Sequence, residues 1–286
     1  MISAKIIKHS SYEGSEMISI ETKSPKFLDA EIEKHRMISS NSSSSRAIPF
    51  NKILEANPYL PKDVRFNQKG MQGKEQIDRD TLIQFHKELN GMYKYISDSL
   101  KYLNDVHNIH KQHLNRYLEP FTMQTKIMTA TKPEWEYFLS LRLHKAADPN
   151  IYELARCIDH EIRTSKPEEI GINDWHLPYV SWDERSKLEY PELLKISVAR
   201  CARTSYKLHD GNPTSVDKDL ELFSKLTDSN PPHLSPLDHQ AKPIHEGARF
   251  RTKGITHMFR DGSFGSGNLT NWIQYRHWWL DENQSN

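Results

Sequence analysis

Apolar and polar positions alternate near the start of the chain and again around residue 125, which is the pattern of β-strands with one buried face. Between residues 3 and 23 the alternation continues on both sides of Gly14, so it predicts two short strands joined by a turn. A further strand is predicted over Thr122 to Thr131. The pattern therefore predicts a sheet that draws on both regions.

Helical periodicity separates and follows these strands. From Asp80 to Leu118, apolar residues recur every three or four positions without a proline, which predicts one or two amphipathic helices. We expect this apolar stripe to be part of the protein core rather than a cofactor groove. Further helices are predicted over Glu134 to Ala147, around Ile151 to Ile162 after the interruption at Pro149, and over Asp217 to Leu226. Strands combined with helices predict an α/β (α+β) fold.

Two stretches show little periodicity and are predicted to be irregular. Prolines and glycines recur between Pro49 and Lys74, and aromatic residues are frequent in the loop predicted from Gly171 to Trp182. The chain contains no internal repeat. With 286 residues it is long enough to bury a sizeable core in one large or two small domains.

Composition narrows the function classes. Basic and acidic residues nearly balance, 39 against 38, so a nucleic-acid-binding role would need a local basic patch. No stretch approaches the roughly 20 apolar residues of a membrane span. The two cysteines, Cys157 and Cys201, are far apart and form no CxxC motif, as is typical of a reducing compartment. We therefore expect a soluble, cytoplasmic protein that binds neither nucleic acid nor membrane.

The most informative chemistry lies between Lys34 and Arg46, where a Lys-His-Arg run precedes a serine-rich run and a further arginine. Guanidinium groups, hydroxyls and backbone N–H groups all bind phosphate oxygens, so a nucleotide phosphate or a flavin pyrophosphate would suit this segment. The alternative is a flexible low-complexity linker. Apolar residues such as Ile32 and Phe50 bracket the run, which favours a binding loop.

A metal site has little support in the sequence. His107, His110 and His113 recur at three-residue steps, but no acidic partner at helical spacing completes a ligand set. His233 and His239 likewise lack a recognisable zinc pattern. We expect no metal.

Four blocks together resemble the flavin-dependent thymidylate synthases, the ThyX family. The family signature is Arg-His-Arg, seven residues and a serine, and here it is Lys34-His35-Arg36 followed by Ser44. The other blocks are 116–142, with Arg116-Tyr117-Leu118-Glu119-Pro120 and Leu141-Arg142-Leu143-His144, then 197–206, with Ala202-Arg203-Thr204-Ser205-Tyr206, and 233–239, with Ser235-Pro236-Leu237-Asp238-His239.

The chain departs from the family pattern in a few places. Lys34 replaces the leading arginine, Ser42 stands where a glutamate is usual, and Glu31 stands where a glutamine is usual. The last two blocks usually precede the signature but follow it here, which resembles a circular permutation and the order in phage-type members. The tail from 254 to 286, including the familiar block Asn268 to Arg276, receives no role.

The resemblance implies one catalytic domain over residues 1–286, built on a twisted mixed sheet flanked by long helices. It implies a flavoenzyme that converts deoxyuridine monophosphate (dUMP) to thymidylate, with sites where the subunits of a homotetramer meet. Methylenetetrahydrofolate would donate the one-carbon unit to reduced FAD, and NADPH would restore the flavin. The residues implied to contact FAD are Lys34, His35, Arg36, Ser42, Ser205, His233, Ser235 and Asp238. Those implied to contact dUMP are Glu31, Lys34, Ser42, Ser43, Ser44, Ser45, Arg46, Arg116 and Arg142.

Arg142 matches the arginine that promotes ionisation of the uracil ring in the family, and we expect it to be catalytic. A guanidinium beside the pyrimidine can stabilise the negative charge that develops on the ring when C5 is methylated. The alternative is a surface arginine paired with Glu134 or Asp148. Two other functions stay open, which are a nucleic-acid-binding protein and a degenerate relative that binds flavin and nucleotide without turnover.

Overall fold

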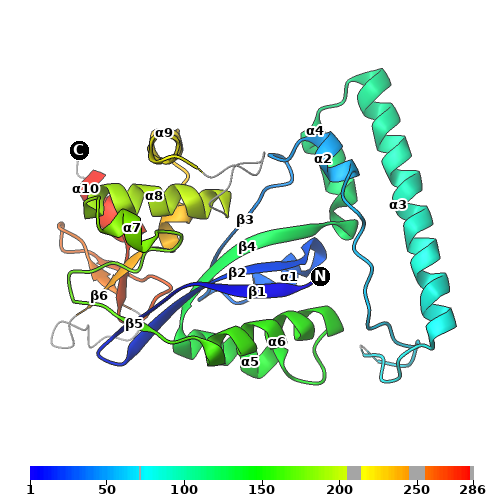
Figure 1. The fold of residues 1–286 in the computed structure, drawn as a ribbon, viewed down its shortest axis with the longest axis horizontal. Coiled ribbons are helices and arrows are strands. Elements are labelled where there is room, and N and C mark those ends of the chain that lie inside the picture. The colour runs from blue at the N-terminus through cyan, green and yellow to red at the C-terminus, as the bar shows by residue number, and fades with distance from the viewer. Residues whose placement is uncertain (71, 205–213, 245–254, 284–286) are drawn as a thin grey trace.

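The computed structural model describes residues 1–70, 72–204, 214–244 and 255–283, and its centre is a twisted five-stranded sheet (Figure 1). The strand order is β3-β4-β2-β1-β5. These strands are β1 Ser3–Tyr12, β2 Ser15–Pro25, β3 Ser39–Ser42, β4 Met123–Thr131 and β5 Glu168–Glu169. All neighbours are antiparallel except β1 and β5, so the sheet is mixed, as expected for this α/β fold.

The predicted strands around Gly14 are β1 and β2. Glu13 and Gly14 form a two-residue loop in which both have positive φ, 48° and 75°. This is the backbone that a type I′ hairpin turn requires, and glycine adopts it without steric cost. The hairpin is confirmed, and so is the strand predicted from Thr122, which begins one residue later.

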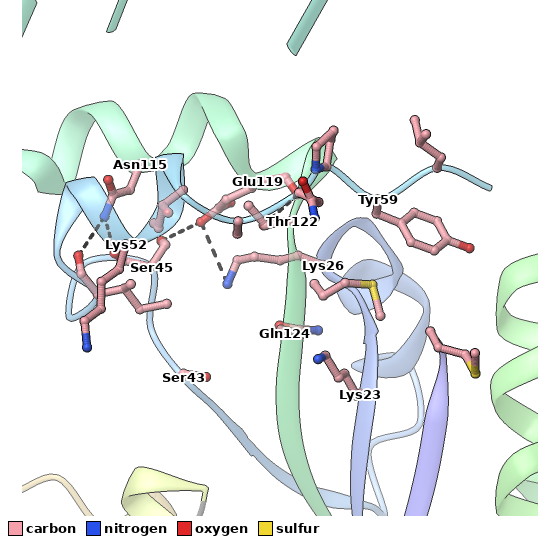
Figure 2. A pocket seen from close by; sticks show the side chains of 18 of the residues that line it. Lys23, Lys26, Ser43, Ser45, Lys52, Tyr59, Asn115, Glu119, Thr122 and Gln124 are labelled. Carbon is pink, nitrogen blue, oxygen red and sulfur yellow. Dashed lines mark hydrogen bonds and ion pairs between the residues drawn. The ribbon is translucent and has the colours of Figure 1, made fainter. Parts of the chain in front are cut away.

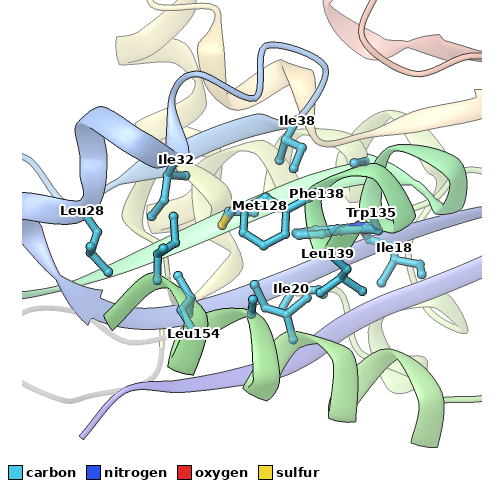
Figure 3. Packing of buried hydrophobic residues seen from close by; sticks show 14 of the residues in the cluster. Ile18, Ile20, Leu28, Ile32, Ile38, Met128, Trp135, Phe138, Leu139 and Leu154 are labelled. Carbon is cyan, nitrogen blue, oxygen red and sulfur yellow. The ribbon is translucent and has the colours of Figure 1, made fainter. Parts of the chain in front are cut away.

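The two faces of the sheet carry different side chains because residues alternate along each strand. Helices α5 (Lys132–Arg142) and α6 (Pro149–Thr164) cover one face, as Figure 1 shows. There, Ile18 and Ile20 of β2 pack with Trp135 and Phe138 of α5 in the largest apolar cluster (Figure 3). Helix α5 ends at Arg142, five residues before the predicted end, and Asp148 caps α6 by accepting from the Asn150 N–H at 2.8 Å.

Helix α8 (Tyr190–Arg203) covers the opposite face, and α9 (Val216–Thr227) packs against it. Short helix α7 (Trp182–Arg185) precedes α8, and the aromatic segment before α7 is the predicted loop. A buried ion-pair network ties α8 to α9, since Arg200 donates to Asp219 at 2.8 Å and Arg203 pairs with the same carboxylate. Both carboxylate and guanidinium are buried, so each compensates the other's lost hydration.

The amphipathic stretch predicted from Asp80 to Leu118 forms α3 (Arg79–His107), α4 (Lys111–Leu114) and the 3-10 helix η2 (Asn115–Phe121). The expectation that its apolar stripe is core is wrong for most of α3. Figure 1 shows α3 standing apart from the sheet, and only Leu100 on it is buried. Tyr93, Ile96 and Leu100 pack on short helix α2 (Phe50–Leu54) and η2, which are too small to cover the rest.

The remaining elements connect or close the sheet. The 3-10 helix η1 (Lys26–Leu28) and α1 (Asp29–Ile32) lead from β2 towards β3. After α9 come η3 (Ser235–Asp238), β6 (Ala241–Pro243), β7 (His257–Met258), β8 (Phe264–Gly265), β9 (Trp272–Gln274) and α10 (Tyr275–Asn283). Strands β6 and β9 pair, as do β7 and β8. Within the described ranges, no helix has the length and apolarity needed to cross a membrane.

Candidate active site

Three predicted site residues meet where α5 ends. Arg142 donates from Nε to His35 Nε2 at 2.9 Å and from Nη1 to Glu31 Oε2 at 2.8 Å. Its Nη2 also donates to the Glu31 carbonyl oxygen at 3.2 Å. Arg142 therefore pairs with Glu31 rather than with Glu134 or Asp148. We call Glu31, His35 and Arg142 the arginine cluster.

His35 is buried within this cluster and is neutral. Its ring packs edge-on against Phe138 with 4.7 Å between centroids. Burial, followed by the nearby Arg142 charge, lowers the His35 pKa to about 4. Because Nε2 accepts from Arg142, the ring proton lies on Nδ1. His35 thus orients the guanidinium instead of adding a third positive charge to the signature.

Two exposed cations flank the arginine cluster. Lys34 lines a depression of about 700 Å³ together with Glu31 and Arg142. Arg36 is also exposed, and within the described part of the chain neither Lys34 nor Arg36 forms an ion pair. Positive side chains without a protein carboxylate are available to an anionic ligand such as a phosphate.

The serine run alternates between two directions. Ser45 is buried and donates to Glu119 Oε1 at 2.6 Å, and Ser43 donates to the Thr125 carbonyl oxygen at 3.5 Å. Ser44 and Arg46 are exposed instead, and the Arg46 N–H donates to Ser44 Oγ at 3.3 Å. The run is therefore an ordered strand and turn rather than a linker. Of the residues predicted to bind phosphate, Ser43 and Ser45 therefore face the protein, whereas Ser44 and Arg46 face outward.

Helix η2 holds the serine run in place. Asn115, which is fully buried, donates from Nδ2 to the Ser45 carbonyl oxygen at 2.6 Å and to the Ile48 carbonyl oxygen at 3.0 Å. The next residue, Arg116, is exposed. Asn115 therefore ties the segment that contains Ser45 to the segment that contains Arg116, two residues predicted to contact dUMP.

A buried lysine lies beneath the signature segment and was missed by the sequence interpretation. Lys126 on β4 pairs in register with Ser42 on β3 and is only 2% exposed. Its ammonium group binds Asp29 Oδ1 at 3.0 Å and also Glu33 Oε1, which accepts from Ser40 Oγ at 2.8 Å. Polar residues such as Gln124 and Thr125 also occur in β4, so the lysine did not stand out in the strand pattern, although a buried lysine requires carboxylate partners such as these.

The predicted C-terminal block also lies beside the serine strand. Helix η3, which contains Ser235 and Asp238, lies against β3. Gln274 joins them by donating from Nε2 to Ser39 Oγ at 3.3 Å and to the Asp238 carbonyl oxygen at 3.1 Å. Segments nearly 200 residues apart in the sequence therefore meet at one edge of the sheet.

Asp238 occupies a distinct electrostatic environment in this block. Burial raises its pKa to about 6, although the ion pair with Arg276 at 3.1 Å acts in the opposite direction. Gln274 and Arg276 both come from the tail block that received no role in the sequence interpretation. His233 and Ser235 are exposed, and Ser205 lies outside the described residues.

Neither cysteine is an activated nucleophile. Cys201 is fully buried and burial raises its thiol pKa. Burial also raises the pKa of the half-buried Cys157 thiol. A thiolate requires the opposite shift, so the site's chemistry depends on other groups. Among the described residues, no group of three His, Cys, Asp or Glu side chains is arranged to hold a metal ion.

A second cavity, of about 610 Å³, opens beside Ser43 and Ser45 (Figure 2). Four lysines line it, and we call it the cationic cavity: Lys23, Lys26, Lys52 and Lys62. It shares no lining residue with the depression that contains Arg142. Within one chain, the predicted nucleotide contacts therefore do not converge on a single cavity.

Comparison with known proteins adds a family assignment. The family model described as thymidylate synthase complementing protein (Thy1) matches residues 4–168, more than half of the chain. No curated protein matches the sequence. The matched segment contains the whole arginine cluster and the serine run, whereas the blocks at 197–206 and 233–239 lie beyond it.

Two solved structures illustrate the similarity. The UMP/dUMP methylase PolB from Streptomyces cacaoi, bound with 5-Br UMP, aligns with a TM-score of 0.48 and 16% identity over 56% of this chain and 88% of its own. Thymidylate synthase X from Helicobacter pylori, with FAD and dUMP, aligns with a TM-score of 0.36 and 18% identity over 51% of this chain and 67% of its own. On the family match over residues 4–168, the chain belongs to the thymidylate synthase complementing protein family, the ThyX family that its motifs resemble.

Proposed function

We propose that this protein is a flavin-dependent thymidylate synthase that converts dUMP to thymidylate. The observation that carries the proposal is the arginine cluster, in which an ordered guanidinium is held by a neutral imidazole and a carboxylate within the matched segment. A fixed positive charge stabilises negative charge on a reacting ring without having to reorganise during the reaction. Arg142 is the residue we assign to the uracil ring.

The exposed side of the serine run fits the nucleotide phosphate. The exposed hydroxyl of Ser44 and the guanidinium of Arg46 can bind phosphate oxygens, and we assign Ser42 and Arg116 to the same ligand. The hydroxyls of Ser43 and Ser45 already donate within the protein. We therefore expect them to shape the loop more than they contact the phosphate.

Lys34 and Arg36 fit the pyrophosphate of FAD, because both are exposed cations without an ion pair in the described ranges. Reduced FAD would supply the reducing equivalents, with methylenetetrahydrofolate and NADPH as co-substrates. The protein's own contribution is to bind and orient the reactants and to place charge at the uracil. Ser205, His233, Ser235 and Asp238 are proposed to complete the flavin site.

The proposal includes a homotetramer with sites between subunits. Apolar side chains on α3 are exposed in the single chain, including Tyr95 at 76% and Val106 at 60%. Exposed apolar surface of this kind marks protein interfaces. A second subunit would also supply what one chain lacks, because the exposed Ser44 and Arg46 do not line the depression that contains Arg142.

The decisive experiment measures binding and turnover separately. The purified protein should be yellow, and dUMP should perturb its flavin spectrum. It should form thymidylate when methylenetetrahydrofolate and NADPH are added. Steeply salt-dependent DNA binding by a colourless protein would contradict the proposal in favour of a nucleic-acid-binding role. Flavin and dUMP binding without thymidylate would indicate a degenerate relative.

Arg142→Ala tests the assigned residue. We expect it to retain flavin but to lower thymidylate formation at least a hundredfold, since a preorganised charge contributes roughly 3–4 kcal/mol to the transition state. Arg163→Ala, an exposed arginine on α6, is the matched control and should keep full activity. Unchanged turnover in Arg142→Ala would refute the role of Arg142.

A further inference from the structure

The cationic cavity carries a surplus of positive charge that the protein does not neutralise. Its lining includes four lysines and one carboxylate, that of Glu119. Glu119 lies 3.8 Å from the Lys26 ammonium group and also accepts from Ser45. Lys23 and Lys62 form no ion pair with any described residue. At least two ammonium groups at this cavity therefore lack a protein counter-charge.

The lysines come from separate elements and are spread around the cavity. Lys23 lies on β2, Lys26 on η1 and Lys52 on α2, while Lys62 follows α2 in the chain. Figure 2 shows Lys52 on one side and Lys23 on the other, with Ser43 and Ser45 between the two sides. One phosphate group would engage a single cluster of donors, whereas spread ammonium groups match several separated anionic groups.

The walls between these charges are largely apolar. Ile48, Ile53, Leu60 and Met123 line the cavity, and the ring of Tyr59 lies along one end in Figure 2. Three amides also line it, and the buried oxygens of two of them, Asn115 Oδ1 and Gln124 Oε1, have no hydrogen-bond donor within the described residues. An apolar wall with a few polar groups is typical of a site for an organic ligand.

We propose that the cationic cavity binds an organic ligand that carries several separated anionic groups on an apolar or aromatic body. The site is independent of the arginine cluster, because the two share no lining residue. The anionic groups can be carboxylates, as along an oligoglutamate chain, or phosphates, as in a dinucleotide. The choice of a folate oligoglutamate and a dinucleotide as probes rests on the proposed function, because its two co-substrates, methylenetetrahydrofolate and NADPH, are both anionic.

Binding to the full-length protein can be measured by calorimetry with pteroylpentaglutamate and, separately, with NADP⁺. The test variant is Lys23→Ala/Lys62→Ala, and the control is Lys5→Ala/Lys87→Ala, which removes the same charge from exposed lysines outside the cavity. We expect the test variant to weaken one of the probes roughly tenfold, and the loss to shrink at high salt. The control variant should bind as the parent does.

The probe that responds identifies the chemistry. A loss confined to pteroylpentaglutamate, and absent for a pteroylmonoglutamate, assigns carboxylates, whereas a loss confined to NADP⁺ assigns phosphates. Equal affinities of parent and test variant for both probes would overturn the inference, as would equal losses in test and control variants. Lys23→Arg/Lys62→Arg should restore binding, and circular dichroism verifies that all variants fold. The proposed function is tested separately, by dUMP binding and by the activity of Arg142→Ala. If the cavity variants bind both probes as the parent does, the proposed function is therefore unaffected.

Discussion

At the residue scale, the arginine cluster shows how one buried group controls a neighbour. His35 lies between Arg142 and Phe138, and its low pKa keeps it neutral near pH 7. A protonated imidazole would lose the hydrogen bond from Arg142 and would repel the guanidinium. The Lys-His-Arg run thus combines two exposed cations with one neutral positioning group, which a count of ionisable residues does not distinguish.

Glu31 stands where a glutamine is usual in the family, and this difference can be tested directly. Its carboxylate neutralises part of the Arg142 charge through the contact at 2.8 Å. Glu31→Gln keeps a hydrogen-bond acceptor but removes the negative charge, so we expect dUMP to bind about two- to fivefold more tightly. Titration of the flavin spectrum measures this, with Glu192→Gln, at a partly exposed position on α8, as the control. Weaker dUMP binding in Glu31→Gln would contradict the expectation.

Asn115 gives a second prediction at this scale. From a fully buried position it donates to the carbonyl oxygens of Ser45, in the serine run, and of Ile48, just after it. Asn115→Ala removes both donors, and we expect it to lower the free energy of unfolding by about 1–3 kcal/mol. Urea denaturation measures the change. Exposed Gln112→Ala should have little effect, and an equal effect of the two substitutions would argue against this role for Asn115.

At the element scale, the sequence predicted most of the regular structure but not where each element packs. The strands on either side of Gly14 and the strand ending at Thr131 were recognisable because alternation directly reflects a half-buried sheet. The short strand β3 was not predicted, since a run of serines has no alternation to detect. Its pairing with β4 creates the two-sided character of the serine run.

The candidate site was predicted only in part, for a similar reason. The motifs located Glu31, His35 and Arg142, and the structure brings these three together. No local pattern indicated that Lys126 is buried beside Ser42 or that Gln274 joins Asp238 to β3. Such contacts depend on long-range chain topology, which a one-dimensional pattern does not contain.

Helix α3 carries the prediction that belongs to elements. If its exposed apolar side chains form a subunit interface, Tyr95→Glu/Val106→Glu should reduce the mass of the assembly, because burying charge without a partner is costly. Size-exclusion chromatography with light scattering measures the mass. Trp182→Glu on α7 is the control, since Trp182 is equally exposed at 78%. If both variants keep the mass of the parent assembly, another surface joins the subunits.

At the scale of the whole molecule, several histidines are buried away from the surface. His239 is fully buried, with Nδ1 2.8 Å from Thr129 Oγ1, and burial lowers its pKa to about 3. His176 lies between Ser10 and Ser19, and its pKa also lies well below the usual value. These groups belong to a hydroxyl and imidazole network that links β1, β2 and β4 across the sheet.

This network predicts how stability depends on pH. A histidine with a depressed pKa takes up its proton readily only after unfolding, so the free energy of unfolding falls as pH decreases below about 6.5. The loss should be about 1–2 kcal/mol per fully buried imidazole between about pH 7 and about pH 5. Asp238, with its raised pKa of about 6, acts in the opposite direction and offsets part of it.

Chemical denaturation at several pH values checks this expectation. His239→Gln should reduce the pH dependence because it removes one titrating group while keeping a polar side chain beside Thr129. Exposed His113→Gln serves as the control and should leave the dependence unchanged. A free energy of unfolding that stays constant from about pH 7 to about pH 5 would show that these imidazoles do not govern acid stability.

The two-sided arrangement of residues 42–46 makes the length of this segment as important as its chemistry. Ser43 and Ser45 face the protein interior while Ser44 and Arg46 face outward, and neighbouring serines are chemically interchangeable. Loss of one serine would therefore barely alter composition, yet it would turn Arg46 inward against Glu119 and remove it from the ligand side. In this segment a single-codon deletion should be far more damaging than any exchange of serine for threonine.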